Sequence, residues 1–457
     1  MTSATRVLLD LTAAYAWRGQ KAVGIVRTER EIGLRLLDDR SLSILPFIFH
    51  GGSMRAVDLA FARLLLTEGD ASSEVVPPPT AGRSMLARLI RPAAMTARFL
   101  ARTVLRAVPD RARPEAKLSL LHLREAARRL VYGVPPATVP PAPTRVLPDL
   151  SLVVHPRPGD VIWTCGLGWE HFDWSPIAAA KARSGFRIVC LCYDLIPILF
   201  PDWIPAEPDK YLGHFLHLID SADEVPCISR CTERDVIAFA SANGRKRPST
   251  HVIRLGADLP AAPDPSALDP ALVDRFAAGR FALSVGTFEV RKNYGMLLDV
   301  WESLVANPNF DLDLVIVGMR GWMADEVIAR FEASPLKNQR IFWLRGVGDA
   351  ALSWLYERCH LVVYPSLYEG WGLPVVEALQ HRRPVIASSR GGVPEAGMAV
   401  ATIIDPDDFG AWRGAIADMA TTPRTKTPPM TPPSWDDAAA TARAILLGTA
   451  RRAESVA

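Results

Sequence analysis

Short apolar runs alternate with amphipathic stretches along the second half of this chain. The runs predict strands at 281–285, 312–317, 341–344, 361–364, 385–387 and 402–404, and the stretches between them predict helices near 294–305, 323–333, 349–358, 373–381 and 407–420. Such alternation is typical of βαβ units, whose parallel strands form one sheet covered by helices on both faces. We therefore expect a doubly wound α/β domain that binds its ligand at the carboxyl ends of its strands.

The first half of the chain carries the same pattern less regularly. Its predicted strands are 6–11, 45–49, 161–164, 187–192, 224–228 and 251–255, interrupted by a long insertion at about 70–150. This pattern indicates a doubly wound domain over residues 1–262, followed by the second one over residues 278–422. A proline-rich stretch at 260–265 joins them as a stiffened linker. After a second proline-rich stretch, Ser434 is expected to cap a last helix within 434–457.

Composition places the chain among folded proteins of two domains. It has 457 residues, of which 49% are apolar and 22% charged, and a net charge of +3 does not indicate a nucleic-acid partner. No apolar run reaches the ~18 residues of a membrane span, and the first residues do not resemble a secretory signal. Six scattered cysteines lack the spacing of a zinc site and predict buried, reduced thiols, which favours a cytoplasmic protein.

The insertion has two parts of unusual composition. Residues 134–148 hold six prolines and predict an extended linker, whereas residues 83–113 hold eight arginines and one acidic residue. The arginines at 83–113 fall mainly on one side of predicted helices, with apolar residues on the other. Such a helix packs its apolar side on its own domain, or it lies on an anionic membrane surface. Both interpretations stay open, and the second predicts peripheral association with a membrane.

Two glutamates, Glu369 and Glu377, stand eight positions apart after the strand predicted at 361–364. Glu369 therefore lies in a loop at the carboxyl end of a strand, and Glu377 lies one turn into the following helix. Gly370 and Gly372 allow a tight bend and a close approach by a ligand. A helix N-terminus behind a glycine loop suits phosphate, and carboxylates accept hydrogen bonds from hydroxyl groups. Phosphate together with many hydroxyls describes a nucleotide sugar.

Arg291 and Lys292 follow the strand predicted at 281–285, after Gly286. An isolated pair of basic residues is usually solvated. This pair instead lies at the carboxyl end of a strand and before a helix, at the same sheet edge as Glu369. Two fixed cations at that edge can hold a diphosphate and stabilise the charge that grows as it leaves.

These segments resemble the Glu-x7-Glu motif and the diphosphate-binding stretch of retaining glycosyltransferases of family 4, which have the two-domain GT-B fold. The resemblance runs through most of the chain outside about 52–150 and is strongest in the second half. It implies that Glu369 contacts the donor hexose and that Glu377 holds the ribose hydroxyls. It also implies that Arg291 and Lys292 bind the donor phosphates.

The resemblance places further donor contacts at Gly370, Gly372, Leu373, Val347 and Gly24. Val347 matches the position at which the family holds the nucleotide base by backbone contacts. Gly24 is the best match for a glycine that faces the acceptor and the donor phosphate, and Gly19 is a looser candidate. The resemblance also places the helix after Ser434 against the first domain.

Four residues of other matched segments have less direct roles. Tyr193 and Asp194 resemble a His-Asp-x-x-Pro segment on the acceptor side, but a tyrosine replaces the usual histidine. Because a tyrosine is a poor general base near neutral pH, the resemblance does not transfer a proton-shuttling role to Tyr193. Asp194 stays an acceptor-side candidate that could instead cap the next turn. Ser229 is expected to cap a helix, and Glu395 is expected to be structural, near the core of the second domain.

The resemblance implies a retaining transferase that moves a hexose from a nucleotide diphosphate sugar to a hydroxyl of a glycan or lipid-linked acceptor. Mannose is the first expectation, with GDP-mannose or a UDP-sugar as donor substrate, no further cofactor and no metal ion. One alternative is a sugar-nucleotide epimerase of similar fold, which the glutamate pair and the Gly-Trp-Gly-Leu-Pro spacer argue against. Another is a non-catalytic scaffold that binds the donor, with Tyr193 marking lost chemistry.

Overall fold

The structure is a computed structural model that describes residues 5–18, 24–67, 148–166, 174–205, 208–259 and 262–450. The chain divides into two compact units, one formed by Met1–Ala71 with Pro148–Ala457 and the other by Ser72–Leu147. The second unit lies outside the described residues, and so do the predicted arginine-rich helices at 83–113 and the candidate Gly19.

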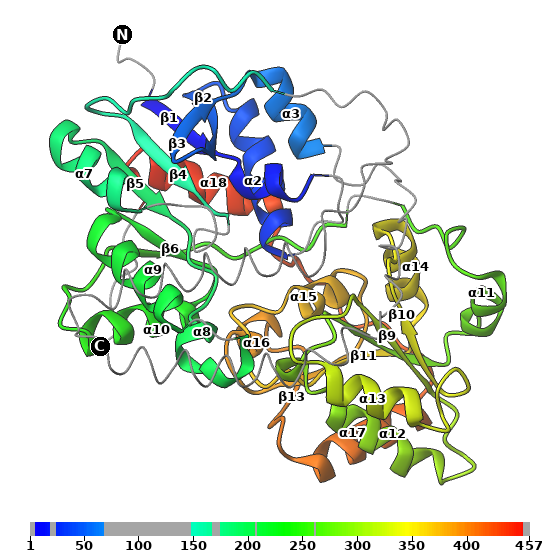
Figure 1. The fold of residues 1–457 in the computed structure, drawn as a ribbon. Helices are drawn as coiled ribbons and strands as arrows, with labels where there is room; N and C mark the ends of the chain where they lie inside the picture. Colours follow the sequence, from blue (N-terminus) through cyan, green and yellow to red (C-terminus); the bar gives the residue numbers. More distant parts are fainter. Residues whose placement is uncertain are drawn as a thin grey trace, which may run out of the picture. The chain divides into compact units, whose positions relative to one another are not determined.

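A five-stranded sheet with the order β3-β2-β1-β4-β5 carries the first part of the chain (Figure 1). Its strands are β1 (Thr5–Asp10), β2 (Leu42–His50), β3 (Ser53–Ala56), β4 (Val161–Thr164) and β5 (Arg187–Cys190). All neighbours pair in parallel except β3, which returns antiparallel to β2. Two short parallel strands, β6 (Val225–Cys227) and β7 (Thr250–Val252), continue from the end of β5 through single bridges. The sheet is the predicted doubly wound one, with β3 as an unpredicted edge strand.

Seven helices and one 3₁₀ turn are described around this first sheet. They are α1 (Thr12–Ala16), α2 (Gly24–Asp38), α3 (Leu59–Thr67), α7 (Trp174–Ser184), α8 (Ile196–Leu199), η3 (Pro201–Trp203), α9 (Pro208–Ser221) and α10 (Arg230–Ala242). The predicted cap of α10 is confirmed, because the Ser229 side chain accepts a hydrogen bond from Thr232 N–H at 3.0 Å.

A six-stranded parallel sheet with the order β10-β9-β8-β11-β12-β13 carries the second part. Its strands are β8 (Phe281–Val285), β9 (Asp313–Val317), β10 (Ile341–Leu344), β11 (Leu361–Tyr364), β12 (Val385–Ser388) and β13 (Thr402–Ile404). Its helices are α11 (Pro270–Phe276), α12 (Tyr294–Val305), α13 (Asp325–Ala333), α14 (Asp349–Arg358), α15 (Leu373–Gln380), α16 (Val393–Ala396) and α17 (Phe409–Thr421), with a 3₁₀ turn η4 (Val290–Lys292). The predicted strands therefore match the observed ones to within about one residue.

The two faces of this second sheet bury separate apolar clusters. Alternate residues of β9 and β11 pack toward α12 and α17 on one face, and the others pack toward α14 and α15 on the opposite face (Figure 1). Every residue of β9 and β11 is buried as a result. Burial on both faces explains why these strands are continuous apolar runs in the sequence rather than alternating ones.

The winding direction of the second sheet reverses between β8 and β11. From β8 the chain winds outward through β9 and β10, then returns to β11 beside β8 and winds the other way through β12 and β13. Ligands of doubly wound sheets bind outside the carboxyl ends of the strands at such a switch point. The fold therefore places the candidate site after β8 and β11.

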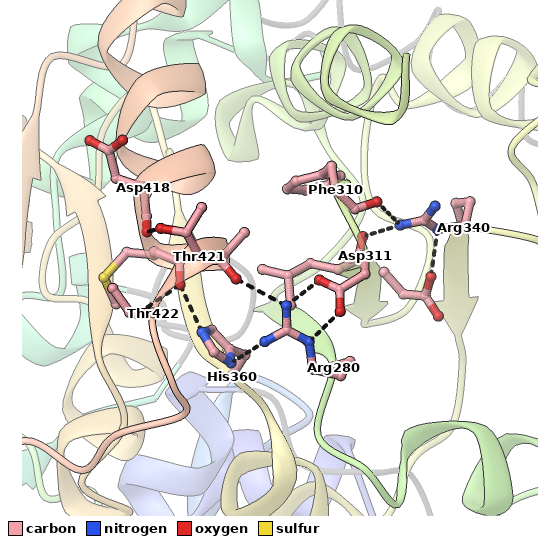
Figure 2. Close-up of polar contacts among 12 residues, drawn as sticks. Arg280, Phe310, Asp311, Arg340, His360, Asp418, Thr421 and Thr422 are labelled. Carbon is pink, nitrogen blue, oxygen red and sulfur yellow. Dashed lines mark hydrogen bonds and ion pairs between the residues drawn. The ribbon is translucent and has the colours of Figure 1, made fainter. Parts of the chain in front are cut away.

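A polar cluster closes the opposite edge of the same sheet, at the amino ends of β8, β9 and β11. Arg280 donates to both carboxylate oxygens of Asp311, to Nδ1 of His360 at 3.3 Å and to the carbonyl of Ala420 at 3.0 Å. His360 in turn donates from Nε2 to the carbonyl of Met419 at 2.9 Å. Figure 2 shows Arg280 between Asp311 and His360, beside the end of α17. We refer to Arg280, Asp311 and His360 as the amino-edge cluster.

The last described helix, α18 (Trp435–Leu446), contacts α2. Ser434 caps it as predicted, in a capping box with Asp437. Arg35 of α2 donates to Asp436 at 2.5 Å, and this ion pair joins the two helices. The limits set from the sequence at 262, 278, 422 and 434 stay predictions. Across the described ranges, no helix combines the length and the apolar character that crossing a membrane requires.

Candidate functional site

The switch point of the second sheet brings two loops together. The loop after β8 turns through η4, which carries Arg291 and Lys292, and the loop after β11 carries Glu369 toward the start of α15. The backbone N–H of Leu367 donates to the carbonyl of Arg291 at 2.7 Å, so the two loops pair directly. Parallel strands therefore place the basic pair and Glu369 together, as their positions after the two strands predicted.

Glu369 lies between two cations. Its Oε1 accepts a hydrogen bond from Nζ of Lys292 at 2.5 Å, and its Oε2 accepts one from Nη1 of Arg291. Arg291 also pairs through Nη2 with Glu289 at 2.8 Å. Glu369 and Lys292 are only 8% and 7% exposed, so these charges interact with little screening by water. We refer to Arg291, Lys292 and Glu369 as the carboxyl-edge cluster.

The surroundings of Glu369 decide its charge. Burial raises the pKa of Glu369, but the attraction of Arg291 and Lys292 outweighs burial and lowers that pKa to about 2. Burial lowers the pKa of Lys292 against the opposing attraction of Glu369, and Nζ of Lys292 also donates to the Tyr364 hydroxyl at 2.8 Å. Glu369 is therefore ionised at neutral pH and can only accept hydrogen bonds.

Glu377 is held by a cation and a phenol from two different parts of the chain. Its Oε1 accepts from Nη1 of Arg27 at 2.8 Å, and its Oε2 accepts from the Tyr356 hydroxyl at 2.8 Å. The glutamate is 4% exposed. Arg27 belongs to α2 of the first sheet's half, so this ion pair joins the two halves of the unit. Sequence reasoning assigned no role to Arg27 or Tyr356, because neither belongs to a motif that names a partner.

The start of α15 combines a glycine turn with a proline in the first helical turn. Gly372 adopts φ +131°, a conformation that residues with a side chain rarely adopt. Leu373 then begins the helix, and a Cβ placed on Gly24 would lie 3.7 Å from its Cδ1. Gly24, the first residue of α2, therefore lies beside the N-terminus of α15. Backbone N–H groups at a helix N-terminus suit a phosphate.

Val347 lies between β10 and α14. It is buried, and the preceding Gly346 has a left-handed backbone with φ +69°. That turn places Gly348 as the N-cap of α14. The predicted backbone contact with the base stays a prediction.

Tyr193 lies after β5 with its hydroxyl buried against main-chain carbonyls. The hydroxyl donates to the carbonyl of Cys165, and the carbonyl of Ile25 lies 3.3 Å away. Burial raises the pKa of Tyr193 well above its ordinary value, and Cys165 and Glu29 add to the effect. The phenol therefore joins the end of β4 to the start of α2, and it is even less suited to accept a proton than a free tyrosine.

Asp194 caps the turn that follows it. Its Oδ1 accepts from the backbone N–H of Ile196 at 3.0 Å, which is the alternative role considered from the sequence. Burial raises the pKa of Asp194 against the attraction of Arg291. The backbone here also meets the loop between β11 and α15, because a Cβ on Gly370 would lie 2.1 Å from the carbonyl oxygen of Tyr193. Only a glycine allows these two loops to approach so closely.

Glu395 is a structural residue, as expected, and it lies in α16 between Val393 and Ala396, which are buried in the apolar core. Glu395 is half-buried and accepts hydrogen bonds from the backbone N–H of Arg230 at 2.9 Å and from Nε of Arg254 at 3.1 Å. Both partners come from the first part of the chain. The Pro-Glu pattern located a turn but could not reveal which elements would pack against it.

The sequence predicts that the six cysteines are buried and reduced, and that they form no zinc site. Each of the six cysteines is a buried free thiol. Within the described ranges, no cluster of three or more His, Cys, Asp or Glu side chains could hold a metal ion.

Parts of this chain are similar to known proteins. Residues 275–426 match the family model described as glycosyl transferases group 1. The chain is 32% identical over 220 residues to the serotype-specific mannosyltransferase WbdA of Escherichia coli. These residues make up 46% of this chain and 27% of WbdA. It is 28% identical over 226 residues to the O-antigen chain mannosyltransferase B of Escherichia coli, covering 49% of this chain and 59% of that protein. The chain thus spans only part of the length of these relatives.

Solved structures share the fold at low sequence identity. Sucrose-phosphate synthase from Thermosynechococcus elongatus has a TM-score of 0.55 and 17% identity, with 97% of this chain and 95% of that one covered. The Anabaena HepE protein in complex with UDP and glucose has a TM-score of 0.53 and 16% identity, with 98% and 95% covered. Both neighbours are GT-B glycosyltransferases. The match over residues 275–426, the relatives and the fold together show a GT-B protein whose second half is similar to glycosyl transferases group 1 and to these mannosyltransferases.

Proposed function

We propose that this chain transfers a hexose, with mannose as the first choice, from a nucleotide diphosphate sugar to a hydroxyl group of a glycan or lipid-linked acceptor, with retention of anomeric configuration. The observation that carries this proposal is the carboxyl-edge cluster. Arg291 and Lys292 hold an ionised, buried Glu369 at the switch point of a doubly wound sheet. Cations, a carboxylate and a helix N-terminus in one place fit a diphosphate that is joined to a polyhydroxyl compound.

The two cations take the part of a metal ion in this mechanism. As the bond between the sugar and the diphosphate breaks, negative charge grows on the leaving phosphate. Arg291, Lys292 and the N-terminus of α15 stabilise that charge. Because Lys292 is held by Glu369 and Tyr364, its position is set before the donor arrives. Activity is accordingly expected to persist after removal of divalent cations with EDTA.

The two glutamates hold the donor through hydrogen bonds from its hydroxyl groups. Glu369, with its pKa lowered to about 2, accepts hydrogen bonds from hydroxyls of the hexose. Glu377 accepts hydrogen bonds from the ribose, while Arg27 and Tyr356 orient it. Gly370, Gly372 and Leu373 bring the backbone close to the diphosphate, Gly24 faces it from α2, and Val347 lies beside the base. A buried, ionised carboxylate of this kind is a poor proton donor, which argues against general acid catalysis by Glu369.

Retention follows from attack on the face that the diphosphate leaves. The acceptor hydroxyl oxygen forms a bond to the anomeric carbon as the bond from that carbon to the phosphate oxygen breaks. The hydroxyl proton passes to an oxygen of the departing phosphate. The raised pKa and the main-chain hydrogen bond of Tyr193 support this route, because they leave Tyr193 as a scaffold for the acceptor side rather than a base.

The two relatives are mannosyltransferases, which supports the mannose expected from the sequence. GDP-mannose is therefore the first donor to test, with UDP-sugars second. Thermal unfolding of the purified chain with GDP, UDP and ADP measures binding, because a ligand at about 100 times its Kd stabilises the native state by about 2.7 kcal/mol. GDP-mannose and UDP-glucose are then tested for hydrolysis and for transfer to manno-oligosaccharides. Stabilisation by no nucleotide would refute the proposal. Binding without hydrolysis or transfer would favour the non-catalytic scaffold.

The place of action is proposed as the cytoplasm, with peripheral contact to a membrane through the arginine-rich residues 83–113, which lie outside the described residues. A basic amphipathic helix binds anionic lipid through charge and apolar area together. Flotation of the chain with anionic vesicles, compared with neutral vesicles, tests this contact. Equal recovery with both vesicles would remove it.

A further inference from the structure

Arg27 contacts three segments of the chain, one of which carries Glu377. Its Nη1 donates to Glu377 Oε1 at 2.8 Å, and its Nη2 donates to the carbonyl of Asp258 at 2.6 Å. Its guanidinium carbon lies 5.7 Å from the ring centroid of Trp435. Asp258 comes just before the stretch that leads to the second sheet, and Trp435 begins the helix that returns to α2. Arg27 therefore lies where both crossings of the chain meet the donor helix α15.

The two crossings are packed against each other at this point. The backbone N–H of Ala257 donates to the carbonyl of Pro433 at 3.2 Å, and the backbone N–H of Trp435 donates to Oδ2 of Asp258 at 3.2 Å. A Cβ on Gly256 would lie 2.2 Å from the backbone nitrogen of Trp435, so no side chain fits there. The segments that Arg27 contacts thus have one fixed arrangement, which fixes the guanidinium as well.

Glu377 depends on Arg27 as its charge partner. The carboxylate is 4% exposed, and its other oxygen accepts from the uncharged Tyr356 hydroxyl. A buried carboxylate that loses its cation becomes an uncompensated buried charge, which is strongly unfavourable, so the side chain is expected to turn away. With Arg27 present, each oxygen of Glu377 has used one hydrogen bond and keeps further accepting capacity. That remaining capacity is what two ribose hydroxyls require.

We propose that Arg27 is a positioning residue for the donor nucleotide. It orients the Glu377 carboxylate toward the ribose, and it ties this carboxylate to the two chain crossings. The inference rests on the proposed function, because it assigns Arg27 to the ribose end of the same donor site. If Arg27 only held the two halves of the unit together, its loss would lower stability and leave the affinity for nucleotide unchanged.

Arg27→Met tests the proposal in the full-length chain. Calorimetric titration with GDP and with UDP gives the Kd for whichever nucleotide binds the wild type. We expect the Kd to rise about tenfold in Arg27→Met, the size associated with losing a hydrogen bond to a charged group. We expect the donor KM to rise in parallel while kcat falls less than about threefold, since uniform binding is lost. Arg27→Lys keeps the charge but can make only one of the contacts with Glu377 and the carbonyl of Asp258. Its Kd is therefore expected to lie between those of wild type and Arg27→Met.

Arg35→Met is the matched control. Arg35 lies on the same helix, and it pairs with Asp436 at 2.5 Å and with Glu31 at 2.7 Å. It therefore joins α2 to α18 without contacting Glu377. Its loss is expected to lower stability and to leave the Kd unchanged.

Glu377→Gln completes a double-mutant cycle with Arg27→Met. If Arg27 acts through Glu377, the double variant binds nucleotide about as weakly as Glu377→Gln alone, because the two losses are not additive. Additive losses, or an Arg27→Met Kd equal to that of wild type, would overturn the inference while leaving the proposed function intact. Absence of nucleotide binding by the wild type would instead remove the proposed function and the inference together. If Arg27→Met does not fold, an unchanged Kd in Arg27→Lys overturns the inference.

Discussion

The second sheet carries a cluster of arginines and carboxylates at each of its two edges, and the two clusters are built differently. At the carboxyl edge, Lys292 donates to the side chains of Glu369 and Tyr364, and Arg291 pairs with Glu369 and Glu289. At the amino edge, Arg280 donates to a carboxylate and also to a backbone carbonyl, and so does Arg340.

The difference lies in whether a partner can be exchanged. A backbone carbonyl is held in place by the fold, so an arginine bonded to it closes the end of a strand and has little freedom to bind anything else. A carboxylate side chain shares its cation with an arriving phosphate at little structural cost. The carboxyl edge also lies at the switch point, behind two glycines and a helix N-terminus, whereas the amino edge is closed by α17 (Figure 2). We infer that the first cluster is for binding and the second for stability.

Lys292→Met is expected to have the largest effect. Under the proposed function it removes one of two cations that stabilise the leaving diphosphate, so turnover is expected to fall about 10²- to 10³-fold. Glu377→Ala is expected to act mainly on donor affinity and to lower turnover less. Single-turnover transfer with saturating donor separates the two effects.

Arg280→Met is the matched variant at the amino edge. It removes a cation from the other end of the same strands, and we expect turnover within about twofold of wild type. The free energy of unfolding is expected to fall by about 1 kcal/mol, because the ion pair of Arg280 with Asp311 is partly exposed. Equal losses of turnover in Lys292→Met and Arg280→Met would mean that the two edges do not differ in function.

Asp313→Asn is expected to have the next largest effect, on stability alone. Asp313 is buried and accepts from Nε of Arg275 at 2.7 Å and from Nε of Arg340 at 2.9 Å. The amide keeps the shape of the side chain but leaves two guanidinium groups without their counter-charge. We expect the free energy of unfolding in urea to fall by about 2–3 kcal/mol. Transfer activity per folded molecule should match wild type, and a loss of activity beyond the unfolded fraction would contradict the structural role.

The two edges are also expected to respond to acid in different pH ranges. Burial lowers the pKa of His360, and Arg280 and Arg424 reinforce this. Since the native pKa lies below the unfolded one, the stability from neutral His360 is present above about pH 6.5 and is lost as pH falls. Glu369, with its pKa lowered to about 2, contributes stability that is present above about pH 4.3 and is lost between there and pH 2.

His360→Gln tests the loss of stability that is expected below about pH 6.5. The glutamine keeps a donor for the carbonyl of Met419 but cannot take up a proton. Urea unfolding at pH 7.5 and pH 5.5 is expected to show a smaller loss of stability in His360→Gln than in wild type. Glu369→Gln should change the pH dependence only below about pH 4.5. A His360→Gln variant with the same loss as wild type would mean that the amino edge does not sense this range.

The second sheet and its carboxyl-edge cluster could be predicted from the sequence for the same physical reason. Strands buried on both faces leave continuous apolar runs, and parallel strands bring their carboxyl ends to one edge. The positions of Arg291 and Glu369 after two such runs therefore implied their meeting. The edge strand β3 was not predicted, because its four residues, Ser53–Ala56, show no run of apolar or β-branched side chains.

Contacts between the two halves of the unit could not be predicted. Arg27 and Glu377 are 350 positions apart, and no periodicity connects them. The partners of Glu395 could not be predicted for the same reason, since Arg230 and Arg254 follow strands of the other half. Local patterns report which residues end a strand or cap a helix, whereas the packing of one doubly wound half on another depends on the shapes of both surfaces.

Tyr193→Phe is expected to have the smallest effect. It removes only the hydroxyl that donates to the carbonyl of Cys165. We expect a loss of about 1 kcal/mol in the free energy of unfolding, the usual contribution of one hydrogen bond, with turnover within about threefold of wild type and the same pH profile from pH 6 to 9. If Tyr193 were a catalytic base, this change would remove the part of the pH profile of turnover that reports its ionisation. A 100-fold fall in turnover with a flattened profile would therefore return Tyr193 to the chemistry, and it would place part of the active centre in the first sheet's half.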